Sequence, residues 1–159
     1  MKKHPKQYWL MKSEPSCFSI DDLEKQDIGM WDGVRNYQAR NMIRDAMRVG
    51  DEVLFYHSSE QPIGIAGVGT IIRAGYPDPT QFDSKADHFD PTAKESDPRW
   101  FVVDVKFQKK FKNILTLSEI KNDPVLKDMV VAQRGSRLSV QPVSEKHFLR
   151  VLSLCKQQQ

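Results

Sequence analysis

The chain has 159 residues, 39% of them hydrophobic and 28% charged, so we expect one globular domain over residues 1–159 with its core at about residues 8–152. Its net charge of +3 is unevenly distributed, because residues 51–105 carry 4 basic and 10 acidic side chains while residues 106–159 carry 11 basic and 4 acidic ones. The sequence has no apolar run near the roughly 20 residues of a membrane helix and no secretion signal, which excludes a membrane partner and leads us to expect a cytoplasmic location.

The first predicted strand covers residues 8–11, YWLM, a short aromatic and apolar stretch. It ends at the polar residues Lys12, Ser13 and Glu14, and the proline that follows them cannot continue a strand ladder. A polar loop therefore follows a rigid strand. Ser19 and the acid three residues later predict a short capped helix over residues 19–26.

The stretch WDGVRNYQAR, residues 31–40, combines a tryptophan with turn chemistry. Gly33 tolerates a left-handed backbone and Asp32 bonds its own turn, whereas a tryptophan in the core is more common in the middle of an element. We therefore expect the ring of Trp31 to line a cavity. The alternative is core packing against the methionines of the helix that follows.

That helix is predicted to begin at Asn36, as its N-cap, and to end at Gly50. Its apolar residues have the spacing of one helix face; they are Ala39, Met42, Ile43, Ala46 and Met47. The opposite face holds Arg40, Arg44 and Arg48 at intervals of four, which is typical of a solvated face and also suits contact with backbone phosphates.

Two strands are predicted next, over residues 52–57 and 62–74. The second contains Gly64, Gly67 and Gly69, whose order is the reverse of a dinucleotide-binding loop, so we interpret them as bends in a curled sheet. Residues 75–99 hold four of the nine prolines and form a long surface loop. Loops of this length inside a domain are usually functional or disordered.

A further strand is predicted over residues 100–107, where apolar residues alternate. Thr116 and Glu119 form a capping box, Asp123 with the proline after it predicts another helix, and Ser144 caps a helix that runs to about Leu152. A turn over residues 134–139 leads into a strand. Strands outnumber helices without strict alternation, which predicts an α+β fold: a small mixed β barrel with helices packed outside.

Signatures of catalysis and of metal binding are absent from the sequence. It has no phosphate loop, no nucleophile elbow, no zinc-protease motif and no His/Cys cluster at metal spacing, and its two cysteines, Cys17 and Cys155, lie far apart. We therefore expect no metal, no cofactor and no enzymatic activity. Among the histidines, His57 stands at a strand end, where a structural role is favoured over that of a general base.

Polar and aromatic groups gather instead at the ends of predicted elements. They are Lys12, Ser13, Glu14, Trp31, Arg35, Asn36, Tyr56, His57 and residues 134–139. Such a set suits a nucleobase, which offers a ring face for stacking and an edge for hydrogen bonds. Trp31 would stack, while Ser13 and Asn36 would bond the edge. For the latter two, a turn bond and a helix cap are the alternatives.

Several motifs in order resemble the EVE domain, from about residue 8 to residue 152. They are WLMKSEP at 9–15, WDGVRNYQAR at 31–40, GDEVLFYHS at 50–58, YPDPT at 76–80, FDP at 89–91, PRW at 98–100 and RLSVQPV at 137–143. The resemblance implies a PUA-like pseudo-barrel with flanking helices, related to YTH domains, and recognition of a modified base without catalysis. One departure from the family pattern is His88, where relatives show an aromatic residue.

Carried over to this chain, the resemblance implies a base pocket drawn from four segments. Its members would be Lys12, Ser13, Glu14, Trp31, Arg35, Asn36, Tyr56, His57, Arg137, Leu138 and Ser139. Phosphate contacts are expected from Arg40, Arg44, Lys109 and Lys110.

The resulting hypothesis is a non-enzymatic reader of a methylated or hydroxymethylated base, flipped out of DNA or RNA. Two alternatives are kept. One is an enzyme that modifies RNA or a nucleotide, with His57 or Glu14 as general base, and the other is a module that binds methylated lysine through cation–π attraction.

Overall fold

The computed structural model describes residues 5–156, so the first four and the last three residues of the predicted domain lie outside it. The strands are β1 Tyr8–Ser13, β2 Ile28–Met30, β3 Glu52–His57, β4 Gly64–Pro77, β5 Phe101–Thr116 and β6 Val140–Val143. The helices are α1 Ile20–Gln26, α2 Tyr37–Asn41, α3 Leu117–Asn122 and α4 Glu145–Lys156. Single turns complete the list: the π-helical η1 Met42–Ala46 and the 3-10 turns η2 Pro79–Phe82, η3 Leu126–Asp128 and η4 Val130–Ala132.

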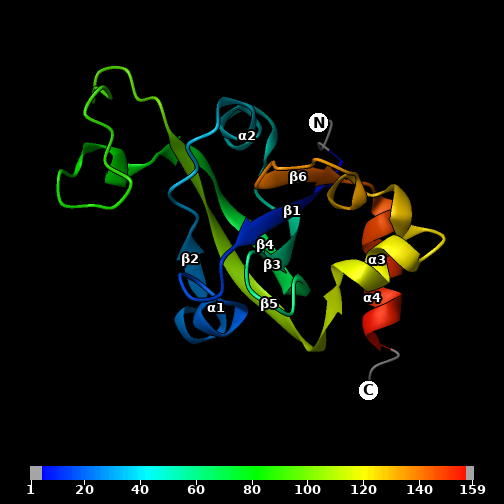
Figure 1. The fold of residues 1–159 in the computed structure, drawn as a ribbon. Coiled ribbons are helices and arrows are strands. Elements are labelled where there is room, and N and C mark those ends of the chain that lie inside the picture. Colours follow the sequence, from blue (N-terminus) through cyan, green and yellow to red (C-terminus); the bar gives the residue numbers. More distant parts are fainter. Residues whose placement is uncertain (1–4, 157–159) are drawn as a thin grey trace.

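The six strands form one sheet in the order β2-β5-β4-β3-β1-β6. Only the β1–β3 pair is parallel, with Tyr8 opposite Glu52 and Ser13 opposite His57, and the other pairs are antiparallel. The predicted α+β class with a mixed sheet and flanking helices is confirmed. The parallel pair places the carboxyl ends of β1 and β3 side by side, which brings two of the predicted polar strand ends together (Figure 1).

Both faces of the sheet are covered, because alternate residues of the same strands enter two separate apolar clusters. In β1, Trp9 and Met11 belong to the cluster under α1, α2 and η1, whereas Leu10 belongs to the cluster under α3 and α4. In β3, Phe55 belongs to the first cluster and Tyr56 to the second. This period of two, with both sides buried, explains why residues 8–11 and 52–57 read as nearly continuous apolar runs.

Glycines allow the long strands β4 and β5 to cross closely. The pairing register shifts on both sides of Gly67, between Ile65 and Gly67 and between Val68 and Gly69. A Cβ atom on Gly67 would lie 2.3 Å from the carbonyl oxygen of Lys109, so any side chain there would force the strands apart. The interpretation of these glycines as bends of a curled sheet is confirmed.

Residues 78–99 leave the sheet between β4 and β5 and form a separate lobe (Figure 1). The lobe is fastened at its base by Gln81, whose side chain is fully buried. Its Nε2 donates to the carbonyl oxygens of Asp78 and Trp100, both at 2.8 Å, and its Oε1 accepts from the backbone N–H groups of Arg99 and Trp100. The long loop of the sequence is therefore an anchored, hydrogen-bonded segment.

Two predicted helices differ from the structure. The helix expected to reach Gly50 ends at Ala46, because the N–H of Met47 bonds back to Met42 in a wider π turn and the N–H of Arg48 bonds the side chain of Asp51 instead. No α-helix begins at Asp123 either. Its carboxylate accepts from the N–H groups of the second and third residues after it and caps only the 3-10 turn η3.

Asp123 also ties η3 to α4, since Arg150 donates to its carboxylate at 2.7 Å. The hydrogen bonds from Arg150, with those from the backbone, lower the pKa of Asp123 to about 2. We expect Asp123→Asn to reduce the free energy of unfolding by about 1–2 kcal/mol near pH 7. Because the pKa of the folded state lies below that of the unfolded chain, about 3.9, this contribution is complete above about pH 4 and is lost between about pH 4 and pH 2.

Denaturant unfolding at pH 7 and at low pH measures this effect, with the exposed Asp128→Asn as the matched control. The difference between wild type and Asp123→Asn should shrink as the pH falls. A difference of the same size at both pH values would contradict the role given to the ion pair.

Candidate functional site

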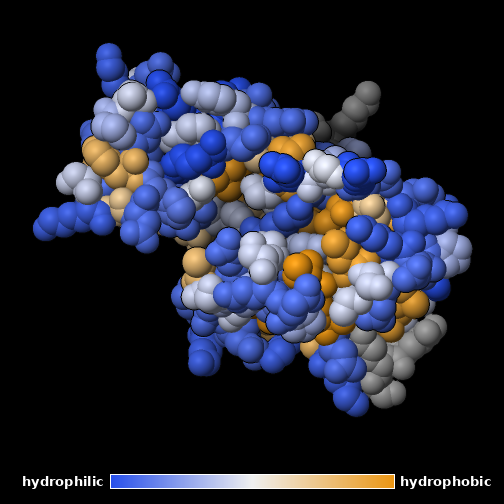
Figure 2. All heavy atoms as spheres, viewed as in Figure 1, coloured by the Kyte–Doolittle hydropathy of each residue, from blue (hydrophilic) through white to orange (hydrophobic). Residues whose placement is uncertain are grey.

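A pocket of about 760 Å³ lies where the lobe of residues 78–99 faces the carboxyl end of β1. The surface is indented between the lobe and the part of the molecule that carries α1 and β2 (Figure 2). We call it the base pocket. Its lining consists of Lys12, Ser13, Glu14, Cys17, Phe18, Gln26, Met30, Trp31, Asp32, Gly33, Thr80, Ala86, Asp87 and His88.

A buried carboxylate, that of Asp78, holds the two sides of the base pocket together. Its Oδ2 accepts from the N–H of Gly33 at 3.1 Å and from Nη1 of Arg35 at 3.0 Å, and its Oδ1 accepts from the N–H and the hydroxyl of Thr80. Burial by itself raises the pKa of Asp78, but the hydrogen bonds from Thr80, Arg35 and Gly33 outweigh burial and lower it. The carboxylate therefore stays ionised and fully bonded.

The turn at Gly33 is packed tightly against the lobe. Gly33 has a φ of +79°, and a Cβ atom on it would lie 2.6 Å from Nε2 of His88. Arg35 holds the backbone of the same histidine, because its Nη2 donates to the carbonyl oxygen of His88 at 2.6 Å. Only glycine fits at this position, so the Asp-Gly turn and the wall formed by His88 depend on each other.

Trp31 is both a core residue and a pocket residue. It is 6% exposed, belongs to the cluster under α1 and α2, and meets Phe55 and Phe18 edge to face at centroid distances of 5.1 and 6.3 Å. The expectation that it borders a cavity agrees with its place in the lining. Its ring face, however, is covered by neighbours, so an open stacking platform on Trp31 is not what the structure provides.

The first loop contributes three predicted residues to the base pocket. The hydroxyl of Ser13 donates to the carbonyl oxygen of Phe18 at 2.6 Å, which is the turn bond foreseen as the alternative role, and leaves its lone pairs available. Lys12 donates to the carbonyl oxygen of Ser136 at 3.4 Å, and burial lowers its pKa. Glu14 accepts from the hydroxyl of Ser59 at 3.3 Å.

Asn36, Tyr56 and His57, which were predicted to belong to the site, do not line the base pocket. The side chain of Asn36 accepts from the N–H of Ala39 as the N-cap of α2. Tyr56 points to the opposite face of the sheet, where burial raises its pKa to about 12. His57 accepts from the N–H of Ile20 at 3.1 Å and burial lowers its pKa, which fits a structural acceptor and not a general base.

Residues 137–139 also lie outside the lining of the base pocket. Ser139 supports it indirectly, since its carbonyl oxygen accepts from the N–H of Lys12 at 2.8 Å, while Leu138 packs against the apolar cluster and Arg137 is exposed. Arg35 likewise does not line the pocket but positions its walls through Asp78 and His88.

The four predicted phosphate ligands fall into two groups. Lys109 and Lys110 lie on β5, and Lys110 is paired with Asp21 at 2.6 Å. Arg40 and Arg44 border a polar hollow of about 340 Å³ whose rim also holds Lys94 and Arg99. Arg44 is paired with its neighbour in sequence, while Arg40 donates to the carbonyl oxygen of Arg99 at 2.9 Å.

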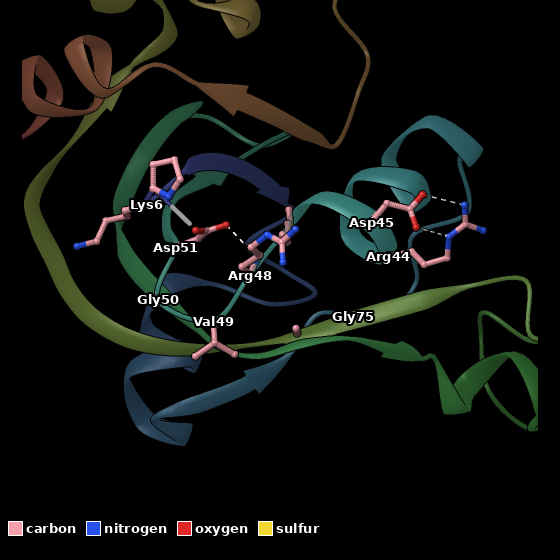
Figure 3. A pocket seen from close by; sticks show the side chains of 11 residues that line it. Lys6, Arg44, Asp45, Arg48, Val49, Gly50, Asp51 and Gly75 are labelled. Carbon is pink, nitrogen blue, oxygen red and sulfur yellow. Dashed lines mark hydrogen bonds and ion pairs between the residues drawn. The ribbon is translucent and has the colours of Figure 1, made fainter. Parts of the chain in front are cut away.

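A third hollow, of about 720 Å³, lies beside η1 (Figure 3). Among the described residues that line it there is no aromatic side chain. Several of its polar groups already have partners within the chain: Arg44 bonds Asp45, and Asp51 accepts from Nε1 of Trp9 and from the N–H of Arg48. This hollow therefore lacks the groups that recognise a base, and the base pocket is the better candidate.

Sequence reasoning missed the wall contributed by the lobe, above all Thr80 and His88. The available signal was the length of the 75–99 loop, together with the departure at His88. It also left Asp32 and Phe18 out of the site, although Asp32 belongs to the quoted motif.

Within residues 5–156 no group of three or more His, Cys, Asp or Glu side chains is arranged to hold a metal ion. None of the helices in the same range combines the length and the apolar character needed to cross a membrane.

The mixed six-stranded sheet, its helices on both faces and the pocket at the end of β1 define an α+β domain of the PUA-like class. A family model described as the EVE domain matches residues 7–154, and the chain belongs to that family. It is 44% identical to human thymocyte nuclear protein 1 over 171 residues, which cover 96% of this chain and 75% of that protein.

Two solved structures illustrate the likeness. A protein of Pseudomonas syringae is 47% identical, with a TM-score of 0.90 over 93% of this chain and 99% of its own. The human THYN1 protein, crystallised in complex with DNA that contains 5-methylcytosine, is 44% identical, with a TM-score of 0.87 over 95% of this chain and 98% of its own.

Replacing Arg35 tests the support of the base pocket. Arg35→Ala leaves the buried Asp78 carboxylate without its charged donor, so we expect a loss of about 1–3 kcal/mol in the free energy of unfolding. Thermal or denaturant unfolding measures it. The matched control is Arg48→Ala, since the Arg48 side chain is exposed; it should change stability by less than ~0.5 kcal/mol. Equal effects of the two variants would refute the role of Arg35.

Proposed function

We propose that this chain is a non-enzymatic module that binds nucleic acid and receives one modified base, extruded from its strand, in the base pocket. The observation that carries the proposal is the crystal structure of the human THYN1 protein with DNA that contains 5-methylcytosine, because that protein matches 95% of this chain at 44% identity. DNA with 5-methylcytosine is therefore the proposed ligand.

The base pocket has the size and the chemistry for this ligand. Its volume of about 760 Å³ exceeds what a single pyrimidine occupies, so it also admits part of the sugar. Phe18 is half-buried and His88 is exposed, so their rings offer the surface for stacking that Trp31 does not. Lys12 and Ser13 supply polar groups on the side of β1.

Catalysis is not part of the proposal, because neither general base considered from the sequence is suitably placed. His57 is buried in a structural hydrogen bond, and Glu14 shares its oxygens with the hydroxyl of Ser59 and the thiol of Cys17. The methyl-lysine alternative needs open aromatic faces around a cation. Trp31 is 6% exposed and already in edge-to-face contact with Phe18 and Phe55, so it does not offer an open face to a cation.

Backbone phosphates are proposed to contact the rim of the polar hollow beside the lobe. Arg40, Lys94 and Arg99 converge there, and α2 leads from this rim back to the turn of the base pocket. A strand that places one base in the pocket would present its neighbouring phosphates along this path. Such contacts give affinity that depends on salt and not on sequence.

One prediction of the proposed function concerns recognition of the modified base. Against a duplex panel that differs at one base, we expect the chain to bind 5-methylcytosine more tightly than cytosine, and His88→Ala to weaken binding by about 1–3 kcal/mol through lost stacking. Fluorescence anisotropy measures the affinities, and mass spectrometry of the recovered oligonucleotide should show no chemical change. The control His147→Ala, on α4, should bind as the wild type does. Equal binding of both duplexes by the wild type would refute the proposal.

Another prediction of the proposed function concerns contacts with the phosphates of the nucleic-acid backbone. Arg40→Gln should weaken binding to modified and unmodified duplexes equally and reduce the slope of log affinity against log salt by about 1. Lys146→Gln, an exposed change on α4, serves as the control with the same loss of charge. A change in base preference without a change in slope would place Arg40 in base recognition instead.

A further inference from the structure

Two polar groups in the lining of the base pocket, adjacent in sequence, make no side-chain hydrogen bond to another residue within residues 5–156. They are the indole N–H of Trp31 and the carboxylate of Asp32, which bonds only its own backbone N–H. The other two tryptophans differ, since Nε1 of Trp9 and Nε1 of Trp100 each donate to an aspartate, at 3.0 and 2.8 Å. A buried indole normally finds an acceptor, so the exception at Trp31 needs an explanation.

The indole N–H of Trp31 keeps some access to solvent. Trp31 is 94% buried, given its 6% exposure, yet the described residues contain only one fully buried side-chain N or O atom without a partner, Oε1 of Gln141. Nε1 of Trp31 is therefore not sealed inside the protein. Because Trp31 lines the base pocket, its unpaired donor is available to an acceptor on a bound ligand.

Asp32 stands beside that donor on a rigid backbone. The N–H groups of Trp31, Asp32 and Gly33 are all bonded, to Val103 at 2.9 Å, to Met30 at 3.1 Å and to Asp78 at 3.1 Å. Its side chain lines the pocket and, apart from the bond to its own backbone N–H, is free to accept. An acceptor and a donor from adjacent residues thus line the same pocket on a backbone that is held in place.

The electrostatics around Asp32 favour a ligand that donates hydrogen bonds. Partial burial and the negative charge of Asp78 raise the pKa of the Asp32 carboxyl, while His88, the hydrogen bond from its own backbone N–H and Arg35 oppose this shift. A carboxylate that has lost hydration beside a second carboxylate gains from an N–H donor and is repelled by a carbonyl oxygen. The pocket's other carboxylates differ: Glu14 already accepts two bonds, and Asp87 lies on the lobe.

On the basis of the proposed function, we propose that Asp32 and Trp31 read the edge of the extruded base and select an amino-pyrimidine such as 5-methylcytosine over thymine. Asp32 accepts from the exocyclic amine, and the indole N–H donates to an acceptor on the same edge of the ring. Thymine carries the same methyl group but presents an oxygen in place of the amine and an N–H in place of the ring acceptor. The oxygen of thymine would face the carboxylate of Asp32, and its ring N–H would face the indole N–H of Trp31. Both contacts are repulsive, so the pocket disfavours thymine.

The test uses three duplexes that differ at one position opposite guanine: 5-methylcytosine, thymine, and 5-methylpyrimidin-2-one, which is 5-methylcytosine without its amine. Fluorescence anisotropy at one fixed salt concentration gives each affinity. Wild-type protein should bind 5-methylcytosine at least ~10-fold more tightly than either of the other two. Thymine opposite guanine is mismatched, so it flips out of the duplex at a lower cost. This difference favours binding of thymine, so a preference for 5-methylcytosine cannot arise from it.

Asp32→Asn is the decisive variant, because its amide offers a donor as well as an acceptor to the ligand. It should reduce the preference for 5-methylcytosine over thymine to below ~3-fold, whereas Asp128→Asn, the same change at an exposed aspartate outside the base pocket, should keep the preference of ~10-fold or more. Trp31→Phe, with folding checked by circular dichroism, should weaken binding of 5-methylcytosine and strengthen that of thymine.

A wild-type protein that does not separate 5-methylcytosine from thymine, or an Asp32→Asn variant that separates them as well as wild type, would overturn this assignment. The proposed function is tested separately, by comparing the affinities for the 5-methylcytosine duplex and for a duplex with unmodified cytosine. If the protein prefers 5-methylcytosine over cytosine but does not discriminate against thymine, the proposed function stands and only the role given to Trp31 and Asp32 is removed.

Discussion

The buried carboxylate of Asp78 is the interaction on which the site depends. It joins the turn at Gly33 and the guanidinium of Arg35 to the start of the lobe at Thr80, which lies more than 40 residues further along the sequence. An ionised group that is entirely shielded from solvent is tolerated only when each oxygen is bonded, and here both are. Any displacement of the lobe would break these bonds, so the walls of the pocket are held at a fixed separation.

The rest of the fold explains why the pocket lies at this place. The parallel pairing of β1 with β3 brings the first polar loop to one side, and Trp31 is bonded through its backbone to Val103 of β5 on the other. Apolar clusters on both faces of the sheet fix these strands. Gln81 then anchors the lobe over the opening. The pocket thus lies between a rigid core and an anchored lobe, and the groups that face it are preorganised.

Caps and turns, which depend on neighbouring residues, could be predicted from the sequence, whereas contacts between distant residues could not. The capping boxes at Ser19 and Thr116 and the left-handed turn at Gly33 were predicted correctly, since each depends on a few neighbouring residues. The strand predicted over residues 100–107 continues to Thr116 in β5, and β2 was not predicted, because pairing with distant strands defines both. Asn36 and His57 were assigned to the site because polar residues at element ends resemble binding groups. A local bond from the N–H of Ala39 satisfies Asn36, whereas His57 accepts from the N–H of Ile20, 37 residues away. His88 was noted as a departure from the family pattern but was not counted among the site residues, because its position depends on a contact across 53 residues with Arg35.

A crystal structure of this chain with a duplex that contains one 5-methylcytosine tests the central claim most directly. The account predicts that the methylated base leaves the helix stack and lies in the pocket between β1 and the lobe, beside Asp32 and His88. A complex in which that base stays stacked in the duplex, or enters the hollow beside η1 instead, would contradict it.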